Sequence, residues 1–304
     1  MAGYDFDNSW EALTEPGRAD RFFCHESLPP LPARGCECRL DTAWWLAELS
    51  RLIYVQEADE IGPAAGSHRR NDHLRAVEAE EVLFVNRQDL SAALVRLPAV
   101  DGAMQNVLVF RGTQNVRNWL SNINVLPASW PTGGLVHRGF LDALDRVWPA
   151  LAPAVADAGP ELLITGHSLG GALATLAAAQ MAAAGAAPTA LYTFGAPRVG
   201  DTAFGRVLDG VPVHRFVNGR DLVPLVPTPG PLVRFKHIGA RRRLTHDGMR
   251  IVSGDIAGLR DWARRARQYF DGLSEHRWRE APPPLADHAP INYVARLDRL
   301  HRLA

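Results

Sequence analysis

Short runs of apolar and β-branched residues alternate with longer stretches of helical spacing along most of the chain. The apolar runs predict strands at residues 82–85, 92–97, 106–110, 162–165, 190–194 and 213–217. An apolar side chain every three or four positions predicts helices at residues 41–54, 140–156, 169–184, 202–208 and 291–300. Strands that are apolar throughout and alternate with helices are typical of a mainly parallel central sheet with helices on both faces. The pattern therefore predicts an α/β fold.

The first forty residues do not share this pattern. Three prolines and a glycine interrupt them, at Pro29, Pro30, Pro32 and Gly35. We expect residues 1–40 to form an irregular N-terminal extension, and residues 41–304 to form one α/β domain with additions. The polar stretch 62–72 is expected to be a loop. Apolar residues make up 47% of the chain, which is enough for one large core.

Composition narrows the classes of function. The 33 basic and 33 acidic side chains cancel, so the excess of positive charge that nucleic-acid binding needs is missing. The basic run Arg241, Arg242 and Arg243 is expected to face solvent in a loop. No apolar run is long enough to span a bilayer, and the acidic residues 1–23 lack the apolar segment of a secretory signal. This leaves two expected locations, the cytoplasm or the exterior after removal of a signal.

Three cysteines, Cys24, Cys36 and Cys38, lie close together near the N-terminus. An odd number in one segment is not a disulfide framework. With His25 they could supply four zinc ligands, but the segment lacks the paired C-x-x-C spacing of structural zinc sites. Ordinary thiols are therefore favoured, and we expect neither a metal nor an organic cofactor.

The strongest chemical signal is the run Gly166-His167-Ser168-Leu169-Gly170, which lies between a predicted strand and a predicted helix. This is the G-x-S-x-G pattern of a nucleophile elbow, in which the serine occupies a tight and strained turn. The two glycines remove side chains that such a turn cannot accommodate. At the start of a helix, backbone N–H groups favour developing negative charge. Ser168 is therefore the candidate nucleophile, and the N–H of Leu169 is one candidate oxyanion donor.

A second oxyanion donor in such a fold comes from a loop after an earlier strand. The strand at 106–110 runs into Arg111-Gly112-Thr113. Thr113 is therefore the candidate, through its backbone N–H and its hydroxyl. A strand followed by Gly-Thr is by itself also typical of an ordinary turn.

In this architecture the serine is followed along the chain by an acid and then by a histidine. Asp221 follows the strand at 213–217, where open α/β sheets place functional groups, whereas Asp201 is better placed to cap the helix at 202–208. Position alone leaves four later histidines as candidates for the base. They are His237 in a strand-like run, His246 in a polar hairpin, His276 in a charged helical stretch and His288 in a loop.

Five motifs follow one another in the chain: F-R-G-T from Phe110, N-W from Asn118, V-H-R-G-F from Val136, G-H-S-L-G-G-A from Gly166 and F-G-A-P-R-V-G from Phe194. Together they resemble the class 3 lipase family, the fungal-type triacylglycerol lipases and their bacterial relatives, over residues 46–300. The resemblance implies the α/β-hydrolase fold and a Ser-His-Asp triad that hydrolyses esters. It also favours Asp221, within N-x-x-D-x-V-P, and His288, within D-H-x-P-x-x-Y.

A short amphipathic helix is predicted directly after Thr113. Its apolar residues follow the spacing of one helix face, at Val116, Trp119, Leu120 and Ile123. The resemblance implies that this helix is a lid, which covers the serine and opens at an oil–water interface. An apolar underside fits that use, because opening in water exposes it. A helix packed permanently on the surface has the same pattern, so lid function is a hypothesis.

We therefore expect an acylglycerol ester hydrolase that contacts a lipid–water interface transiently and binds no nucleic acid. An esterase or phospholipase A1 acting on soluble or phospholipid esters shares the same chemistry, since acyl-chain choice depends on the shape of the pocket. A non-catalytic interaction module on the same scaffold is the alternative of a different class. Its signature is the loss of a site residue, and here all four are present, namely Thr113, Ser168, Asp221 and His288.

Overall fold

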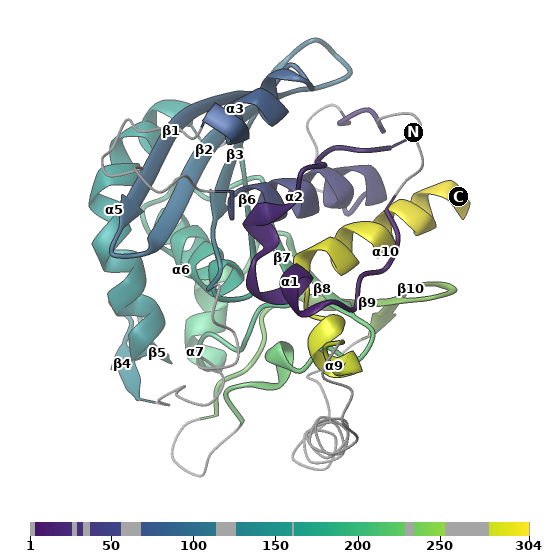
Figure 1. The fold of residues 1–304 in the computed structure, drawn as a ribbon. Coiled ribbons are helices and arrows are strands. Elements are labelled where there is room, and N and C mark those ends of the chain that lie inside the picture. The colour runs from purple at the N-terminus through teal and green to yellow at the C-terminus, as the bar shows by residue number, and fades with distance from the viewer. Residues whose placement is uncertain are drawn as a thin grey trace.

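An eight-stranded sheet, in the order β1-β2-β3-β6-β7-β8-β9-β10, forms the centre of the part of the chain that the structure describes (Figure 1). The structure is a computed structural model and describes residues 4–25, 29–32, 37–55, 68–113, 126–159, 161–228, 234–252 and 280–303. Strands β3, β6, β7, β8 and β9 are parallel neighbours, and antiparallel strands complete both edges. The prediction of a mainly parallel sheet is confirmed. The bounds are β1 Glu80–Arg87, β2 Leu90–Pro98, β3 Met104–Phe110, β6 Leu162–His167, β7 Ala190–Phe194, β8 Val213–Asn218, β9 Ala240–Thr245 and β10 Gly248–Val252.

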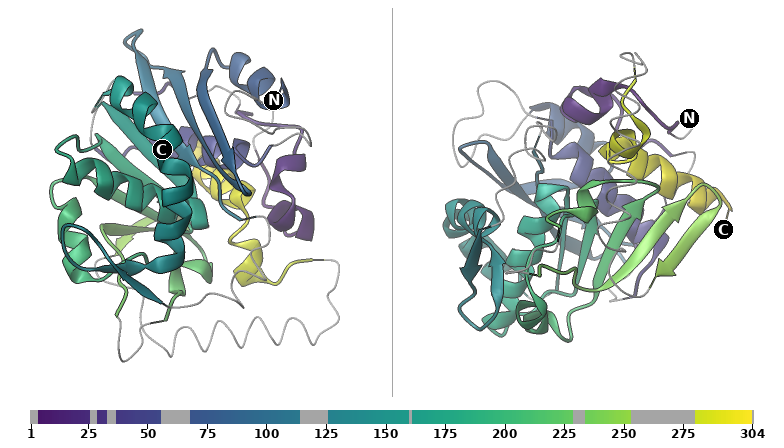
Figure 2. Two further views of the ribbon diagram at one scale, coloured as in Figure 1. Left: turned by 90° about the vertical axis from the view of Figure 1, so that its left-hand side faces the viewer. Right: turned by 90° about the horizontal axis from the view of Figure 1, so that it is seen from below.

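Helices cover both faces of this sheet, as predicted (Figures 1 and 2). α5 (Arg138–Ala158) and α6 (Leu169–Ala183) pack on one face, while α2 (Leu40–Leu52) and α10 (Pro290–Leu303) pack on the other. Each face has its own large cluster of buried apolar side chains. The shorter elements are α1 Trp10–Thr14, η1 Pro16–Arg18, α3 His68–Arg75, β4 Pro127–Ser129, β5 Leu135–His137, α7 Thr202–Gly205, η2 Arg206–Leu208, η3 Val223–Leu225 and α9 Pro283–Ala286. No helix within the described ranges is both long and apolar enough to cross a bilayer.

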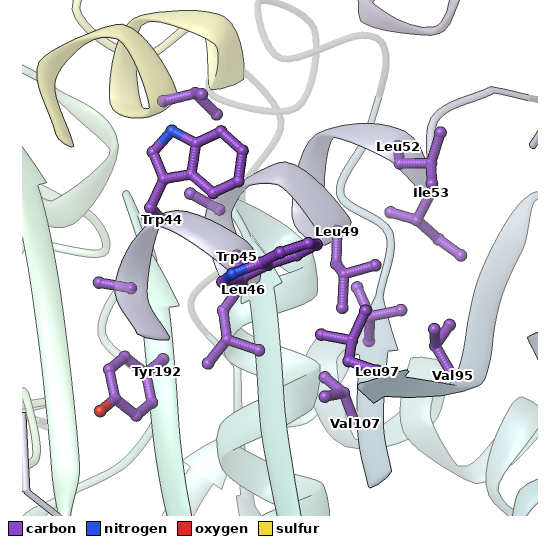
Figure 3. Packing of buried hydrophobic residues seen from close by; sticks show 14 of the residues in the cluster. Trp44, Trp45, Leu46, Leu49, Leu52, Ile53, Val95, Leu97, Val107 and Tyr192 are labelled. Carbon is purple, nitrogen blue, oxygen red and sulfur yellow. The ribbon is translucent and has the colours of Figure 1, made fainter. Parts of the chain in front are cut away.

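α2 is buried along almost its whole length. Its apolar side chains lie against residues of the sheet such as Val95, Val107 and Tyr192 (Figure 3). The helix also buries two charges, Glu48 and Arg51, which form an ion pair of 2.9 Å with almost no exposed side-chain surface. Charges are buried in this way only when they are paired and hydrogen-bonded, because an isolated charge is costly to remove from water.

The same ion pair attaches the N-terminal residues to the domain. Glu48 Oε1 accepts from the Phe23 N–H at 2.9 Å, and Arg51 Nη2 donates to Arg21 O at 2.6 Å. Phe23 belongs to the core cluster that covers the α2 face of the sheet. Residues expected to be irregular therefore contain a helix, α1, and contribute side chains to the core.

Two local predictions are wrong. The basic run expected to be a solvent-facing loop forms strand β9, and Arg242 in it is buried. Its backbone pairs with β8, and the long aliphatic stems of arginine can cover a sheet surface without an apolar alternation in the sequence. In the stretch expected to be a polar loop, residues 68–72 begin α3, while residues 62–67 lie outside the described ranges. Arg70 explains the helix, because it is buried, pairs with Glu81 and donates to Val55 O at 2.8 Å.

The parallel strands direct their carboxyl ends to one edge of the sheet. β3 leads to Gly112, β6 to Ser168, β7 to Gly195 and β8 to Asp221. Ligands of open α/β sheets bind at this edge because loops from neighbouring strands meet there. The turn between α9 and α10 adds His288 to the same region.

Candidate active site

Ser168 occupies the turn between β6 and α6, with a backbone φ of 58° and a ψ of −129°. A positive φ strains any residue that has a Cβ atom. Two backbone hydrogen bonds hold the turn, from Ser168 N–H to Phe194 O at 2.9 Å and from Gly171 N–H to Ser168 O at 3.0 Å. The Ser168 side chain is buried, and its Oγ has no hydrogen-bond partner among the described residues.

Gly166 and Gly170 make this turn possible. A Cβ on Gly166 would lie 2.3 Å from the carbonyl carbon of Gly170, and a Cβ on Gly170 would lie 2.1 Å from Phe110 O at the end of β3. Both clashes are with backbone atoms, which cannot rotate away as a side chain can. The prediction that side chains are excluded at these two positions is confirmed.

The loop after β3 lies directly against the serine. A Cβ on Gly112 would be 3.1 Å from Ser168 Cβ and 2.6 Å from His167 O. Thr113 follows and is half-buried. Leu169 is the first residue of α6, so its N–H is among the four that have no acceptor within the helix. The structure thus brings the Thr113 loop and the N-terminus of α6 to the Ser168 side chain.

Asp221 and His288 form a fully buried pair, with His288 Nδ1 2.8 Å from Asp221 Oδ2. Asp221 accepts two further hydrogen bonds, from Val223 N–H at 2.8 Å and from the Tyr293 hydroxyl at 2.6 Å. Burial, and then the charge of Asp221, raise the pKa of Tyr293 well above its usual range. The Tyr293 hydroxyl therefore stays protonated, and three donors fix the orientation of the carboxylate.

The second ring nitrogen of His288, Nε2, has no hydrogen-bond partner in the part of the chain that the structure describes. Because Nδ1 donates to Asp221, Nε2 carries the free lone pair of the neutral ring. The ring centroid lies 4.5 Å from that of His167, the residue directly before Ser168. Buried polar atoms without a partner are rare and call for a functional explanation. Here the Ser168 hydroxyl and His288 Nε2 are both buried without a hydrogen-bond partner among the described residues.

Gly195 connects the serine turn to the Asp221–His288 pair. It follows β7 with a φ of 61°, and a Cβ there would lie 2.7 Å from Asp221 Oδ2 and 2.9 Å from His288 Nδ1. The residue before it, Phe194, accepts the hydrogen bond of the Ser168 N–H. The carboxylate and imidazole can approach the serine turn only because residue 195 has no side chain.

His167 belongs to a buried chain of hydrogen bonds. Its Nε2 lies 2.7 Å from His288 O, and a carbonyl only accepts, so Nε2 carries the proton. Its Nδ1 then accepts from the Tyr54 hydroxyl at 3.1 Å, and Tyr54 accepts from the Gly112 N–H. Burial first, and then the neighbouring His288, lower the pKa of His167 well below 6.5. Neutral groups thus connect the loop after β3 to the loop of His288.

The other acid and base candidates from the sequence occupy different places. Asp201 caps α7, where its side chain accepts from Phe204 N–H at 2.8 Å. His237 Nε2 lies 2.7 Å from Pro224 O. His246 is exposed and pairs with its neighbour Asp247, and His276 lies outside the described residues. Of the candidate histidines that the structure describes, His288 is the one that pairs with Asp221.

Two groups of predictions concern residues that lie wholly or partly outside the described ranges. The predicted lid residues are all outside, namely Val116, Trp119, Leu120 and Ile123. Cys36 is also outside, while Cys24 and Cys38 are free thiols. Within the described ranges, His, Cys, Asp and Glu side chains form no group of three that could hold a metal ion.

Tyr54, Gly195 and Tyr293 were not singled out from the sequence. Tyr293 ends the D-H-x-P-x-x-Y run and Gly195 follows a strand, so each had a local signal. Tyr54 had none, because a tyrosine at the end of an apolar helix is typical of a core residue. Its partner His167 is 113 positions away.

Comparison with known proteins agrees with the geometry. Residues 107–230 match the class 3 lipase family. The chain is 37% identical over 158 residues to a lipase of Rhizomucor miehei, a match that covers 48% of this chain and 43% of that protein. It is 40% identical over 139 residues to a secreted mono- and diacylglycerol lipase of Fusarium solani, covering 42% and 41%. The chain thus spans less than half the length of either relative.

A solved structure supports the fold. The triacylglyceride lipase of Rhizomucor miehei aligns with a TM-score of 0.52 and 28% identity, over 69% of this chain and 83% of that chain. The chain has the α/β-hydrolase fold, as expected from the sequence.

Gly195→Ala tests the close approach at the Asp221–His288 pair. We expect turnover of a p-nitrophenyl ester to fall by about a hundredfold, because the added methyl group displaces the imidazole. Gly185→Ala is the matched control, since Gly185 also has a positive φ, +76°, but no atom lies within 4 Å of the added Cβ. Both variants should lose about 1–2 kcal/mol of unfolding free energy from backbone strain. Equal turnover in the two variants would contradict the role given to Gly195.

A second prediction follows from the neutral state of His167. The folded pKa lies below the unfolded one, so below pH 6.5 the unfolded chain binds a proton that the native state does not. The contribution of His167 to stability is therefore complete above this pH and is lost as the pH falls, by up to about 1.4 kcal/mol per pH unit.

His167→Gln removes this titration. Urea unfolding at about pH 7 and about pH 5 should give a smaller loss of stability on acidification for the variant than for the wild type. Identical losses would show that His167 does not resist protonation.

Proposed function

Because residues 107–230 match the class 3 lipase family, we propose that this protein hydrolyses acylglycerol esters with Ser168 as the nucleophile. The observation that carries the proposal is the buried Ser168 hydroxyl, which has no partner among the described residues. The ring of the preceding residue, His167, lies 4.5 Å from the ring of His288, and the other nitrogen of His288 is fixed on Asp221. These groups supply what a triad needs, namely a nucleophile, a base and an acid that orients the base.

Acylation begins when Ser168 Oγ attacks the ester carbonyl carbon and His288 Nε2 takes the hydroxyl proton. The new C–O bond forms as the carbonyl π electrons move onto the oxygen, which becomes a tetrahedral oxyanion. The N–H groups of Thr113 and Leu169 stabilise this charge, and each such donor contributes about 2.7–4 kcal/mol. The intermediate then breaks its bond to the leaving alcohol, which receives the proton from His288.

Deacylation repeats these steps with water. His288 takes a proton from the attacking water, the acyl–Oγ bond breaks, and Ser168 recovers its proton as the carboxylic acid leaves. Asp221 stabilises the charged ring of His288 without accepting its proton. The bonds that Asp221 accepts from Tyr293 and Val223 hold it in place for this role. A neutral His167 beside His288 also helps, because a second positive charge there would oppose protonation of His288.

The choice of acylglycerols rests on two observations. Both relatives described above are lipases, and one of them is a mono- and diacylglycerol lipase. The helical spacing of Val116, Trp119, Leu120 and Ile123 in the sequence, directly after Thr113, predicts an apolar face that would suit a lid binding a lipid–water interface. An esterase or a phospholipase A1 would use the same site with a different acyl pocket.

Ser168→Ala tests the nucleophile. We expect ester turnover to fall on the order of a millionfold, because no other group can form the acyl-enzyme. A fluorophosphonate probe should label the wild type and not this variant. Ser50→Ala is the control, since Ser50 is also buried but its hydroxyl lies 3.1 Å from Thr165 Oγ1, and this variant should label normally. Equal labelling of the wild type and Ser168→Ala would rule out Ser168 as the nucleophile, and an absence of labelling in both would favour the non-catalytic module.

Tributyrin titration separates a lipase from the alternatives. The hydrolysis rate should rise steeply as tributyrin passes from solution to emulsion, because opening a lid exposes apolar surface that an interface can cover. p-Nitrophenyl esters of increasing chain length should show an optimum beyond butyrate. A sharp optimum at acetate or butyrate without interfacial activation would identify an esterase. Preferential release of fatty acid from phosphatidylcholine would identify a phospholipase.

A further inference from the structure

Residues 4–16, here called the N-terminal segment, lie beside the turn that carries His288 at the other end of the sequence. α1 lies next to α9 and α10 (Figures 1 and 2). The turn is preceded by α9, which has four residues. A helix of this length is not stable by itself. The position of His288 therefore depends on what packs against the turn.

Asn292 forms the polar contact between the N-terminal segment and this turn. Its side chain is fully buried. The Asp7 N–H donates to Asn292 Oδ1 at 2.7 Å, and Asn292 Nδ2 donates to Asp7 O at 2.6 Å. A third bond runs nearby from Ala281 N–H to Asn8 O at 2.7 Å. The amide thus pairs with the backbone of residue 7 much as two strands pair.

The same amide also fixes the turn around His288. Asn292 Nδ2 donates to Ala286 O at 2.7 Å, two residues before His288. The Asn292 N–H donates to Ala289 O at 2.9 Å, directly after His288. Both hydrogens of Nδ2 are therefore used, one toward the N-terminal segment and one toward the turn. A shift of Asp7 is transmitted to the backbone on each side of His288.

Leu13 forms the apolar contact. It is buried in one cluster with Leu285, Ala286 and Ala289, which surround the turn, and with Val223. Val223 in turn donates its N–H to Asp221. The cluster therefore touches the loops of both the acid and the base.

We infer that the N-terminal segment holds His288 in the geometry that catalysis needs, and that Asn292 is the positioning residue through which it acts. The inference rests on the proposed role of His288 as general base. Neither Asn292 nor Leu13 contacts the reacting atoms, so their effect is on orientation.

Two substitutions test the contacts separately, Asn292→Ala for the polar one and Leu13→Ala for the apolar one. We expect each to lower kcat about tenfold to a hundredfold, with KM little changed, because misplacement of the base slows the chemical step without removing a contact to substrate. Phe22→Leu is the control. Phe22 follows the N-terminal segment in the chain and packs against Arg51 in the main core cluster, which contains neither Leu13 nor the residues of the turn. This variant should lose stability and keep the wild-type kcat.

A spectroscopic readout makes the test independent of turnover. We expect the Nδ1 proton shared by His288 and Asp221 to give a downfield proton resonance, which His288→Gln should remove and thereby assign. This resonance should broaden or disappear in Asn292→Ala and Leu13→Ala and persist in Phe22→Leu. The inference is overturned if all three variants keep the resonance, or if both test variants keep the kcat of Phe22→Leu. If the wild type shows the resonance but hydrolyses no ester, the proposed function is rejected. The effect of Asn292→Ala and Leu13→Ala on the resonance would still decide whether the N-terminal segment positions His288.

Discussion

The close contact between the start of α6 and the end of β3 is the constraint on which the rest of the site depends. No side chain fits between Gly170 and Phe110 O, so the helix begins with its backbone against the neighbouring strand. α6 cannot retreat, because nearly all its residues are buried in the core on that face of the sheet. Ser168 must then connect β6 to α6 through a positive φ, and the loop containing Gly112 comes to lie against its side chain. Packing of the core thus maintains strain at the turn.

The interior around this turn contains many polar side chains. Most of their donors and acceptors have hydrogen-bond partners among the described residues, and a few do not. Tyr54, His167, Asp221 and Tyr293 are buried and hydrogen-bonded to one another or to backbone groups. An unsatisfied buried group costs about 1–3 kcal/mol, which explains why nearly every donor and acceptor here has a partner. Ser168 Oγ and His288 Nε2 are the two atoms of the proposed triad without one in the described ranges. They are also the atoms between which the proposed reaction moves a proton.

The segment that matches the class 3 lipase family supplies only part of the machinery. Residues 107–230 include Ser168, Gly195 and Asp221, while His288 lies beyond them. Further residues around the proposed base come from outside that segment: Tyr54 follows α2, and Tyr293 and Asn292 lie in α10. The N-terminal segment, which was expected to be an irregular extension, is bonded to Asn292. A proposed site assembled from both ends of a chain depends on the folding of the whole domain.

Features that depend on residues close together in the chain could be predicted from the amino-acid sequence. Strand and helix periodicity predicted the central sheet and its covering helices, and the two glycines around Ser168 identified a turn that tolerates no side chain. The order of acid and base along the chain left four histidines open, and only the resemblance to a family favoured His288. The tertiary structure decided which distant groups meet, as Asp7 meets Asn292 and Tyr54 meets His167. In the tertiary structure three consecutive arginines, Arg241 to Arg243, lie in strand β9, and residues 68–72 of the polar stretch begin helix α3. Such outcomes depend on backbone pairing and buried charge pairs between segments far apart in sequence, and the local pattern of side chains does not encode those contacts.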